Sequence, residues 1–217
     1  MKTLLIVADD KIGRRCLREI RQAQLQDVVP VLDSSFSVNR VFRLVRRGHL
    51  KLPWLFHMAA ADLLRRDTPV DRKGIFVVKD RDSIFGLLES VRPDRVLLFR
   101  CGLIINQKIL DRGIPIFNIH CADIPEYGGL GAINRAIADR SICQHAVLHV
   151  IDSTAIDAGT VLACEPYQLI LQKSFRFNED IAFDAGIRLC VRMLRTLSPW
   201  KACENENART QRTTSNQ

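Results

Sequence analysis

Short apolar runs recur along the chain, separated by longer stretches in which apolar residues follow helical spacing. The apolar runs are typical of buried strands, and the amphipathic stretches are typical of surface helices. The pattern predicts strands near residues 4–7, 27–32, 75–78, 96–99, 115–119, 146–151 and 160–170. It predicts helices near 14–25, 34–68 with breaks at Gly48 and Pro53, 83–91, 107–111, 131–138 and 178–197. Asp33 and the two serines after it are expected to cap the helical stretch that follows them.

Strands that alternate with helices favour an α/β fold with a mostly parallel, Rossmann-like sheet covered by helices on both faces. The strands after residue 143 are expected to extend the same sheet, with antiparallel pairing as one option. Residues 1–200 are expected to form one domain, and the polar residues 201–217 a short, disordered extension. Only Gly13 follows the first strand, so the glycine-rich fingerprint of nicotinamide and flavin enzymes is absent.

Composition narrows the class of protein. Of the 217 residues, 47% are hydrophobic and 26% charged, as in ordinary globular domains. The longest apolar runs have strand length, and the start of the chain lacks the apolar region of a signal peptide. We therefore expect a cytoplasmic protein with no membrane partner. The seven cysteines occur singly, which predicts reduced thiols and no metal site.

The formal net charge of +8 suits an anionic partner such as a nucleotide-linked substrate or a polyanionic cofactor. Solvated helix faces on a basic protein are an equally good interpretation. No basic run is interleaved with aromatic residues, as single-stranded nucleic-acid binding requires, so no nucleic-acid partner is expected.

Candidate chemistry lies at the end of the predicted strand 115–119. Asn118 and His120 are two residues apart, so both side chains project from the same face of an extended backbone. Pro125, Gly128 and Gly129 then force a turn, which places the pair at a strand end, where α/β folds bind ligands. Amide and imidazole groups can stabilise an oxyanion and move a proton, which suggests acyl transfer.

A carboxylate within reach would orient His120, and Asp157 is the candidate for that role. The alternative is that His120 is a satisfied polar residue at a strand end and Asp157 a turn former before Gly159. Cys121 as a nucleophile is disfavoured, because neighbours on a strand point to opposite faces.

Three segments resemble the 10-formyltetrahydrofolate-dependent formyltransferases. The segment Phe117-Asn-Ile-His-Cys-Ala-Asp-Ile-Pro-Glu-Tyr-Gly-Gly129 resembles their signature Asn-x-His-x-Ser-Leu-Leu-Pro-x-Tyr-Arg-Gly. Residues 150–163 resemble the second motif, Val-Asp-x-Gly-x-Asp-Thr-Gly-x-Ile-Leu, and 92–104 the strand and loop of the folate site. The resemblance covers roughly residues 85–170 well and the first thirty weakly, and implies the formyltransferase fold.

The resemblance assigns roles. Asn118 and His120 would polarise the formyl carbonyl, and His120 would take part in proton transfer from the attacking amine. Asp157 would pair with His120 or move a proton to the folate nitrogen through water. The residues implied in catalysis are Asn118, His120 and Asp157; those implied in binding the folate co-substrate are Gly102, Leu103, Ile104 and Asp152; those implied in binding the acceptor are Lys11, Tyr127 and Gly128.

The chain also departs from the family pattern. Gly128 stands where these enzymes usually carry an arginine near the acceptor, and residues 122–124 are Ala-Asp-Ile in place of Ser-Leu-Leu. Asp152 and Asp157 are five residues apart where four is usual, so the loop between them is expected to bulge. Acceptor recognition is the property most affected by these changes.

The first loop and the length favour one branch of the family. The segment Val7-Ala-Asp-Asp-Lys-Ile-Gly-Arg-Arg-Cys-Leu17 resembles the Asp-Asn-Lys-x-Gly-x-x-x-Leu opening of sugar N-formyltransferases, and Lys11 could meet a diphosphate there. A solvated lysine is an equally good interpretation. Glycinamide ribonucleotide transformylases carry a glycine-rich phosphate loop at this point, which is missing here. The extra domains of methionyl-tRNA formyltransferases and formyl-folate hydrolases are not expected in 217 residues.

The resemblance thus implies a formyltransferase that acts on a nucleotide-linked amino sugar, such as dTDP-4-amino-4,6-dideoxyglucose, with 10-formyltetrahydrofolate as the donor and a homodimer as one option. Another small amine acceptor, such as glycinamide ribonucleotide, is the first alternative. A non-catalytic folate- or nucleotide-binding relative is the second.

Overall fold

A computed structural model describes residues 1–196 apart from 49 and 68, and leaves the side chain of Arg40 undescribed. The predicted extension 201–217 lies outside the described residues. The strands are β1 (Thr3–Ala8), β2 (Val28–Asp33), β3 (Phe76–Val78), β4 (Arg95–Phe99), β5 (Ile116–His120), β6 (Cys143–Val150) and β7 (Val161–Gln168). The helices are α1 (Lys11–Gln22), α2 (Val38–Arg46), α3 (Leu52–Leu64), α4 (Arg81–Val91), α5 (Gln107–Leu110), α6 (Ala132–Ala138) and α7 (Phe175–Arg195).

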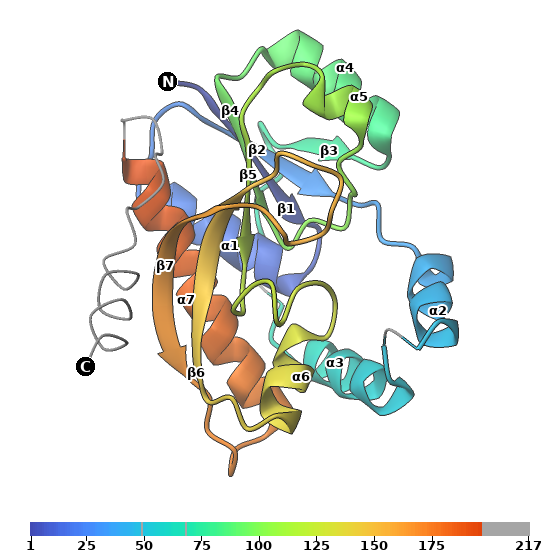
Figure 1. The fold of residues 1–217 in the computed structure, drawn as a ribbon. Helices are drawn as coiled ribbons and strands as arrows, with labels where there is room; N and C mark the ends of the chain where they lie inside the picture. The colour runs from blue at the N-terminus through green and yellow to red at the C-terminus, as the bar shows by residue number, and fades with distance from the viewer. Residues whose placement is uncertain (49, 68, 197–217) are drawn as a thin grey trace, which may run out of the picture.

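The strands form a single seven-stranded sheet in the order β3-β2-β1-β4-β5-β6-β7 (Figure 1). The five strands from β3 to β5 pair in parallel, whereas β6 and β7 continue the sheet in antiparallel pairing. The predicted α/β fold with a mostly parallel sheet is confirmed, and the two antiparallel strands are those after residue 143.

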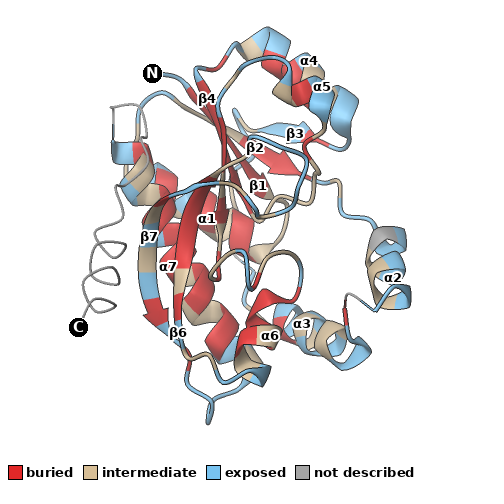
Figure 2. Cartoon of the chain, in the orientation of Figure 1, coloured by how far each residue is buried: buried red, intermediate tan, exposed pale blue. Residues whose placement is uncertain are grey.

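Both faces of the sheet are covered. Leu5 and Val7 of β1 pack in a cluster with residues of α1 and α7, whereas Leu4 and Ile6 pack in a second cluster with residues of α4 and α5. Burial on both faces explains why the parallel strands are continuous apolar runs. Figure 2 shows this burial concentrated on the sheet and on the inner sides of α1 and α7. None of the helices in the described ranges is both long and apolar enough to cross a membrane.

The region between β2 and β3 differs from the rest. The predicted helical stretch 34–68 forms two helices, and α2 stands away from the sheet (Figure 1). The cap expected at Asp33 is wrong, because α2 begins five residues later at Val38. The Asp33 carboxylate instead accepts the N–H groups of Gly102 and Leu103, at 2.5 and 3.0 Å. Asp33 therefore connects the carboxyl end of β2 to the loop after β4.

Candidate active site

Three of the predicted residues meet at the carboxyl end of β5. Asn118 Nδ2 donates to Asp157 Oδ1 at 3.0 Å, and His120 Nδ1 lies 3.2 Å from Asp157 Oδ2. Asn118 and His120 project from the same face of β5, as their spacing predicted, and the carboxylate bridges them. One oxygen of Asp157 thus serves each of the two strand residues.

The loop between β6 and β7 brings Asp157 to this point. At Gly159 a Cβ atom would overlap the carbonyl of Val150, so only glycine lets the two ends of the loop approach this closely. Asp157 itself has a φ of 48°, in the left-handed region that aspartate tolerates better than most residues. The Gly129 N–H donates to Asp157 Oδ2 at 2.7 Å and fixes the carboxylate from the other side.

The surroundings keep Asp157 ionised. Burial raises its pKa, but contact with His149, the charge interaction with His120 and the Gly129 N–H together lower it to about 2. His149 can lower the pKa of Asp157 by a hydrogen bond only when its Nε2 atom carries a proton.

His149 is a site residue that the sequence reasoning missed. It is buried on β6, directly opposite Asn118 in the antiparallel pair. Its Nε2 atom lies 3.0 Å from Asn118 Nδ2, and its Nδ1 atom lies 3.1 Å from the Val150 carbonyl. With the proton on Nδ1, the ring donates to Val150 and accepts from Asn118. A polar residue inside the apolar run 146–151 was the available signal, but its partner follows only from the strand pairing.

Both ring nitrogens of His120 face acceptors. Besides the contact of Nδ1 with Asp157, Nε2 lies 2.8 Å from the carbonyl oxygen of Tyr127. Burial lowers the pKa of His120, and the interactions with Asp157 and Tyr127 oppose that effect without cancelling it. When the ring gains a second proton, its Nδ1–H therefore donates to the Asp157 carboxylate and its Nε2–H to the Tyr127 carbonyl.

A turn at residues 127–130 holds these contacts in place. Arg135 of α6 donates to the carbonyl oxygens of Gly128 and Leu130, the latter at 2.9 Å. The same turn supplies the Tyr127 carbonyl to His120 and the Gly129 N–H to Asp157. Arg135 thus fixes the backbone that contacts two candidate catalytic residues, and the sequence reasoning did not single it out.

The other predicted binding residues lie in different surroundings. Gly102 and Leu103 direct their N–H groups at Asp33, and Ile104 is half-buried beside them. Asp152 is exposed on the loop that carries Asp157. Tyr127 is buried, and its carbonyl is the group that reaches His120. The assignment of these residues to ligand binding stays a prediction.

Lys11 is engaged away from β5. Its Nζ atom donates to the carbonyl oxygens of Asp62, Leu63 and Arg65, at 2.5, 3.2 and 3.0 Å. These carbonyls lie at the C-terminus of α3, where a cation also complements the helix dipole. Lys11 therefore has a structural role, and its predicted role in substrate binding stays a prediction.

Cys121 does not join the site. It packs in the core cluster with α1 and α7, on the face opposite to His120. Burial raises the pKa of its thiol to about 12, so a thiolate nucleophile is not available near neutral pH. The sequence expectation against this nucleophile agrees with its position.

The chain was also compared with proteins of known sequence and structure, and the similar proteins agree with the chemistry suggested by the site. No family model matches the chain. The methionyl-tRNA formyltransferase of Finegoldia magna is 29% identical over 89 residues, which are 41% of this chain and 28% of that protein. The phosphoribosylglycinamide formyltransferase of Anaplasma phagocytophilum superposes with a TM-score of 0.62 at 16% identity, over 88% of this chain and 84% of that one. The chain has the formyltransferase fold.

A sugar N-formyltransferase from Shewanella shares this fold, with a TM-score of 0.57 and 13% identity over 95% of this chain and 75% of that one. The resemblance inferred from the motifs is confirmed, because sequence and structure both lead to formyltransferases. The chain spans less than a third of the length of the Finegoldia relative.

The departures from the formyltransferase pattern have local explanations. A Cβ atom at Gly128 would lie 3.2 Å from the Cβ of Asp157, so a side chain at this position would crowd the carboxylate. The longer Asp152–Asp157 spacing still lets Asp157 reach both residues of β5. Arg135 places a guanidinium beside the turn that contains Gly128, where it donates to the Gly128 and Leu130 carbonyls.

Proposed function

We propose that the chain transfers a formyl group from 10-formyltetrahydrofolate to the amine of a nucleotide-linked amino sugar. One observation supports formyl transfer above all: the carboxylate of Asp157 bridges Asn118 and His120 at a strand end of the formyltransferase fold. The donor binds as a co-substrate, and the segments around Gly102 and Asp152 are its proposed contacts.

The proposed reaction gives roles to Asn118, His120 and Asp157. The neutral amine attacks the formyl carbon, a C–N bond forms, and the carbonyl oxygen gains negative charge. Asn118 and His120 stabilise that oxyanion, and His120 takes the proton that the amine loses. When the bond to the folate nitrogen breaks, His120 gives up this proton, which reaches that nitrogen by way of Asp157 and water. While His120 carries the proton taken from the amine, the ionised carboxylate of Asp157 stabilises the imidazolium.

The substrates must compete with internal hydrogen bonds. Both N–H bonds of the Asn118 amide have partners, Asp157 and the His149 ring, and the Nε2 atom of His120 faces the Tyr127 carbonyl. Binding therefore has to move the turn at 127–130 or rotate the two side chains by enough to present donors to the formyl oxygen. Small shifts of this kind are common when catalytic hydrogen bonds form.

The choice of acceptor rests on the first loop. Its likeness to sugar N-formyltransferases and the Shewanella structure support an amino-sugar acceptor. The loop also disfavours a phosphate at the N-terminus of α1, because Asp10 already accepts the Gly13 N–H at 2.7 Å. Asp9 adds a second carboxylate, paired with Arg14 at 2.9 Å. These acids disfavour the phosphate of glycinamide ribonucleotide at this point, and they equally require the diphosphate of a nucleotide-linked sugar to bind elsewhere. The preference for the amino sugar therefore rests on the likeness of the loop, and glycinamide ribonucleotide is the alternative.

A non-catalytic binding protein is the candidate from a different class. The internal partners of Asn118 and His120 favour it, since an enzyme must release those donors in every turnover. Asp33 adds to this argument, because it occupies the N–H groups of Gly102 and Leu103. A homodimer and a cytoplasmic location stay predictions from the sequence.

One assay separates the three candidates. The chain is mixed with 10-formyltetrahydrofolate and a panel of dTDP- and GDP-amino sugars and glycinamide ribonucleotide, and release of tetrahydrofolate is followed. Turnover with an amino sugar that His120→Ala abolishes would support the proposal. Turnover with glycinamide ribonucleotide alone would show that this compound, and not an amino sugar, is the acceptor. Folate binding without turnover on any amine would favour the binding protein.

The attacking amine supplies a second test. Only its neutral form is a nucleophile, so activity should rise with pH through the pKa of the amine. A rate that is flat between about pH 6 and pH 9, with chemistry limiting turnover, would contradict this mechanism.

A further inference from the structure

The most exposed apolar side chains of the described chain are gathered in one segment. Seven large apolar residues have relative exposures of 66% or more, and all of them lie between residues 36 and 64. Outside this segment, the largest value is 63%, at Ile156. An exposed apolar cluster of this kind marks an interaction surface far more often than isolated apolar residues do.

The first part of the surface is α2, which is strongly amphipathic. At 100° per residue, Val38, Phe42 and Val45 lie on one face. Arg43 lies on the far side of the helix, and Arg46 lies on the flank between that side and the apolar face. None of the α2 side chains that the structure describes is buried, and Phe42 is 68% exposed. On the apolar face of α2, Val38 and Phe42 are therefore exposed, and only Val45 is half-buried.

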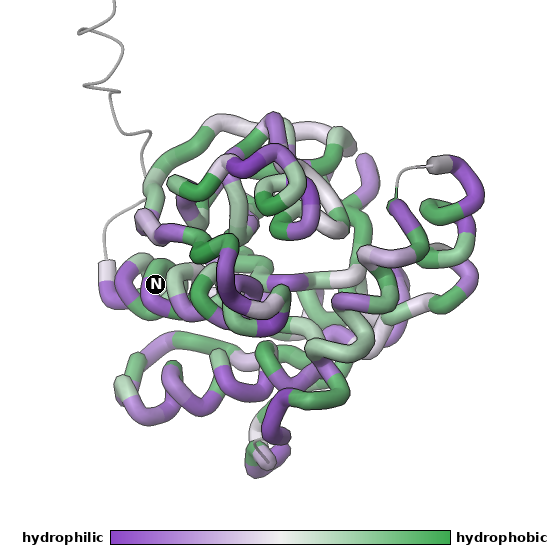
Figure 3. Tube along the Cα trace, turned by 90° about the horizontal axis from the view of Figure 1, so that it is seen from below, coloured by the Kyte–Doolittle hydropathy of each residue, from purple (hydrophilic) through white to green (hydrophobic). Residues whose placement is uncertain are grey.

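The second part is α3. Leu52, Phe56 and Leu63 are spaced four and seven residues apart, which places them in one stripe along the helix. Their exposures are 66%, 73% and 79%. Figure 3 shows hydrophobic and hydrophilic residues alternating along the helices of the molecule.

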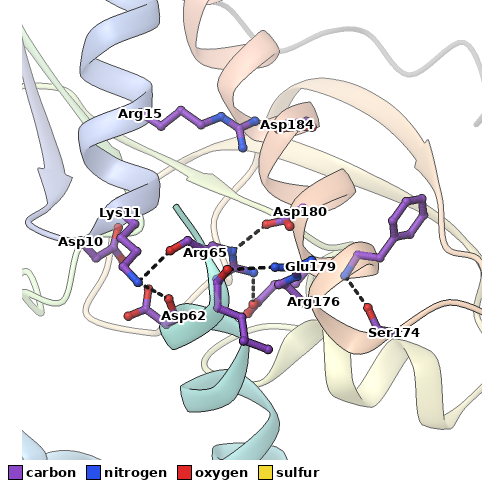
Figure 4. Close-up of polar contacts among 12 residues, drawn as sticks. Asp10, Lys11, Arg15, Asp62, Arg65, Ser174, Arg176, Glu179, Asp180 and Asp184 are labelled. Carbon is purple, nitrogen blue, oxygen red and sulfur yellow. Dashed lines mark hydrogen bonds and ion pairs between the residues drawn. The ribbon is translucent and has the colours of Figure 1, made fainter. Parts of the chain in front are cut away.

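The exposure does not come from loose attachment of α3. Lys11 of α1 caps the C-terminus of the helix, and Arg176 of α7 donates to the Leu64 carbonyl at 2.9 Å (Figure 4). Arg65 then pairs with Glu179 and Asp180 of α7, at 2.5 and 2.6 Å. One end of α3 is thus fixed to two other helices, and its outer stripe is held facing outward.

The charge of the segment selects the kind of partner. Residues 36–64 contain Arg40, Arg43, Arg46, Arg47 and Lys51 but only one acid, Asp62, so five positive charges and one negative charge leave +4. In a symmetric dimer through this surface, two such segments would face each other and repel. An anionic lipid surface instead offers an apolar interior and negative headgroups together.

We propose that α2 and α3 form a peripheral docking surface for an anionic lipid bilayer. The apolar side chains enter the boundary between headgroups and acyl chains, and basic residues at the edge of the apolar face, such as Arg46, contact the headgroups. The sequence predicted no membrane partner because no segment can span a bilayer, but peripheral contact does not require a span. The hydrogen bonds described for Asn118, His120 and Asp157 involve none of residues 36–64, although Leu50 and Trp54 lie close to Gly131, beside the turn at 127–130. The proposal does not depend on the proposed formyl transfer.

Vesicle co-sedimentation of the full chain tests the proposal. One vesicle preparation contains phosphatidylcholine alone, and the other an equimolar mixture of phosphatidylcholine and phosphatidylglycerol. We expect binding to the anionic vesicles only, weakening as salt is added. The variant Phe42→Glu with Phe56→Glu should lose this binding. Ile170→Glu with Leu171→Glu makes the same charge change at other exposed apolar positions and should keep it.

A milder variant guards against a folding defect. Arg43→Gln with Arg46→Gln removes two charges from the exposed side of α2 and should weaken binding about thirtyfold. Absence of binding to anionic vesicles at low salt would overturn the proposal, as would full binding by the Phe42→Glu, Phe56→Glu variant. A dimer in solution that this variant converts to a monomer would show that the surface instead serves a second copy of the chain.

Discussion

The end of β5 and the α2–α3 segment are opposite in how they use polar and apolar groups. At the end of β5, His149 is buried, Asn118 and Asp157 are half-buried, and the three are bonded to one another. In α2 and α3, Phe42 and Phe56 are in contact with water, at 68% and 73% exposure. The first region buries polar groups, and the second exposes apolar ones.

This difference indicates which residues are suited to catalysis and which are suited to contact with another molecule. Burying polar atoms is unfavourable unless each is paired, so a fully paired buried cluster indicates groups held in fixed positions. Exposing large apolar side chains is also unfavourable, which indicates a contact made outside the protein. Substitutions at the end of β5 should therefore reduce catalysis, and substitutions in α2 should leave the folded chain unaffected.

The largest effect is expected at Asp157. Asp157→Asn keeps the shape but removes the charge that stabilises a protonated His120, and kcat should fall about a thousandfold. Steady-state release of tetrahydrofolate measures it. Asp111→Asn, on the surface at the end of α5, is the control and should act like the wild type. Full activity in Asp157→Asn would remove this residue from the mechanism.

Arg135 comes next, because it acts through the turn at 127–130. Arg135→Gln should lower kcat by up to about a hundredfold, since a small displacement of the Tyr127 carbonyl and Gly129 N–H misplaces His120 and Asp157. Arg135→Lys should restore part of the activity. In Arg135→Gln, the pH profile of kcat should shift, because the contacts that set the pKa of His120 change. Arg140→Gln, at an exposed turn residue just after the end of the same helix, is the matched control. An unchanged pH profile would mean that Arg135 matters for folding alone.

The lowered pKa of Asp157 also predicts a pH dependence of stability. Its pKa is about 2 in the folded chain and near 3.8 ordinarily, so the stabilisation is complete above the ordinary value and is lost as pH falls towards 2. Over that range the wild type should lose about 2 kcal/mol more unfolding free energy than Asp157→Asn. Urea denaturation at a series of pH values measures the difference. If the unfolding free energies of the wild type and Asp157→Asn changed equally with pH, folding would not stabilise the ionised carboxylate.

A smaller effect is expected at Lys11. Lys11→Met removes the ammonium from three carbonyls at the end of α3 and should cost about 1 kcal/mol of unfolding free energy. Lys108→Met, an exposed lysine on α5, is the control. A raised acceptor KM without any loss of stability would instead assign Lys11 to substrate binding.

The smallest effect is expected at Phe42. Phe42→Ser should change the unfolding free energy by less than about 0.5 kcal/mol, because the ring is already in water. Phe99→Ala, in the core, should cost about 3 to 5 kcal/mol by contrast. A large loss in Phe42→Ser would mean that α2 packs against the protein and would weaken the comparison.

The sequence determined the layers of the fold and part of the site. Continuous apolar runs such as 4–7 and 96–99 can be buried on both faces only in a covered parallel sheet, so the strands were predictable. The two-residue spacing of Asn118 and His120 set their common face for the same local reason. Periodicity is a property of neighbouring residues, and it needs no knowledge of the rest of the chain.

The tertiary structure decided which distant groups meet. The antiparallel register of β5 and β6 places His149 opposite Asn118, and no local pattern encodes that register. The same holds for Asp33, which resembled a helix cap but binds the loop after β4, and for Lys11, which resembled a substrate contact but caps α3. A polar side chain takes whichever partner the packing brings within reach, and packing depends on the whole chain.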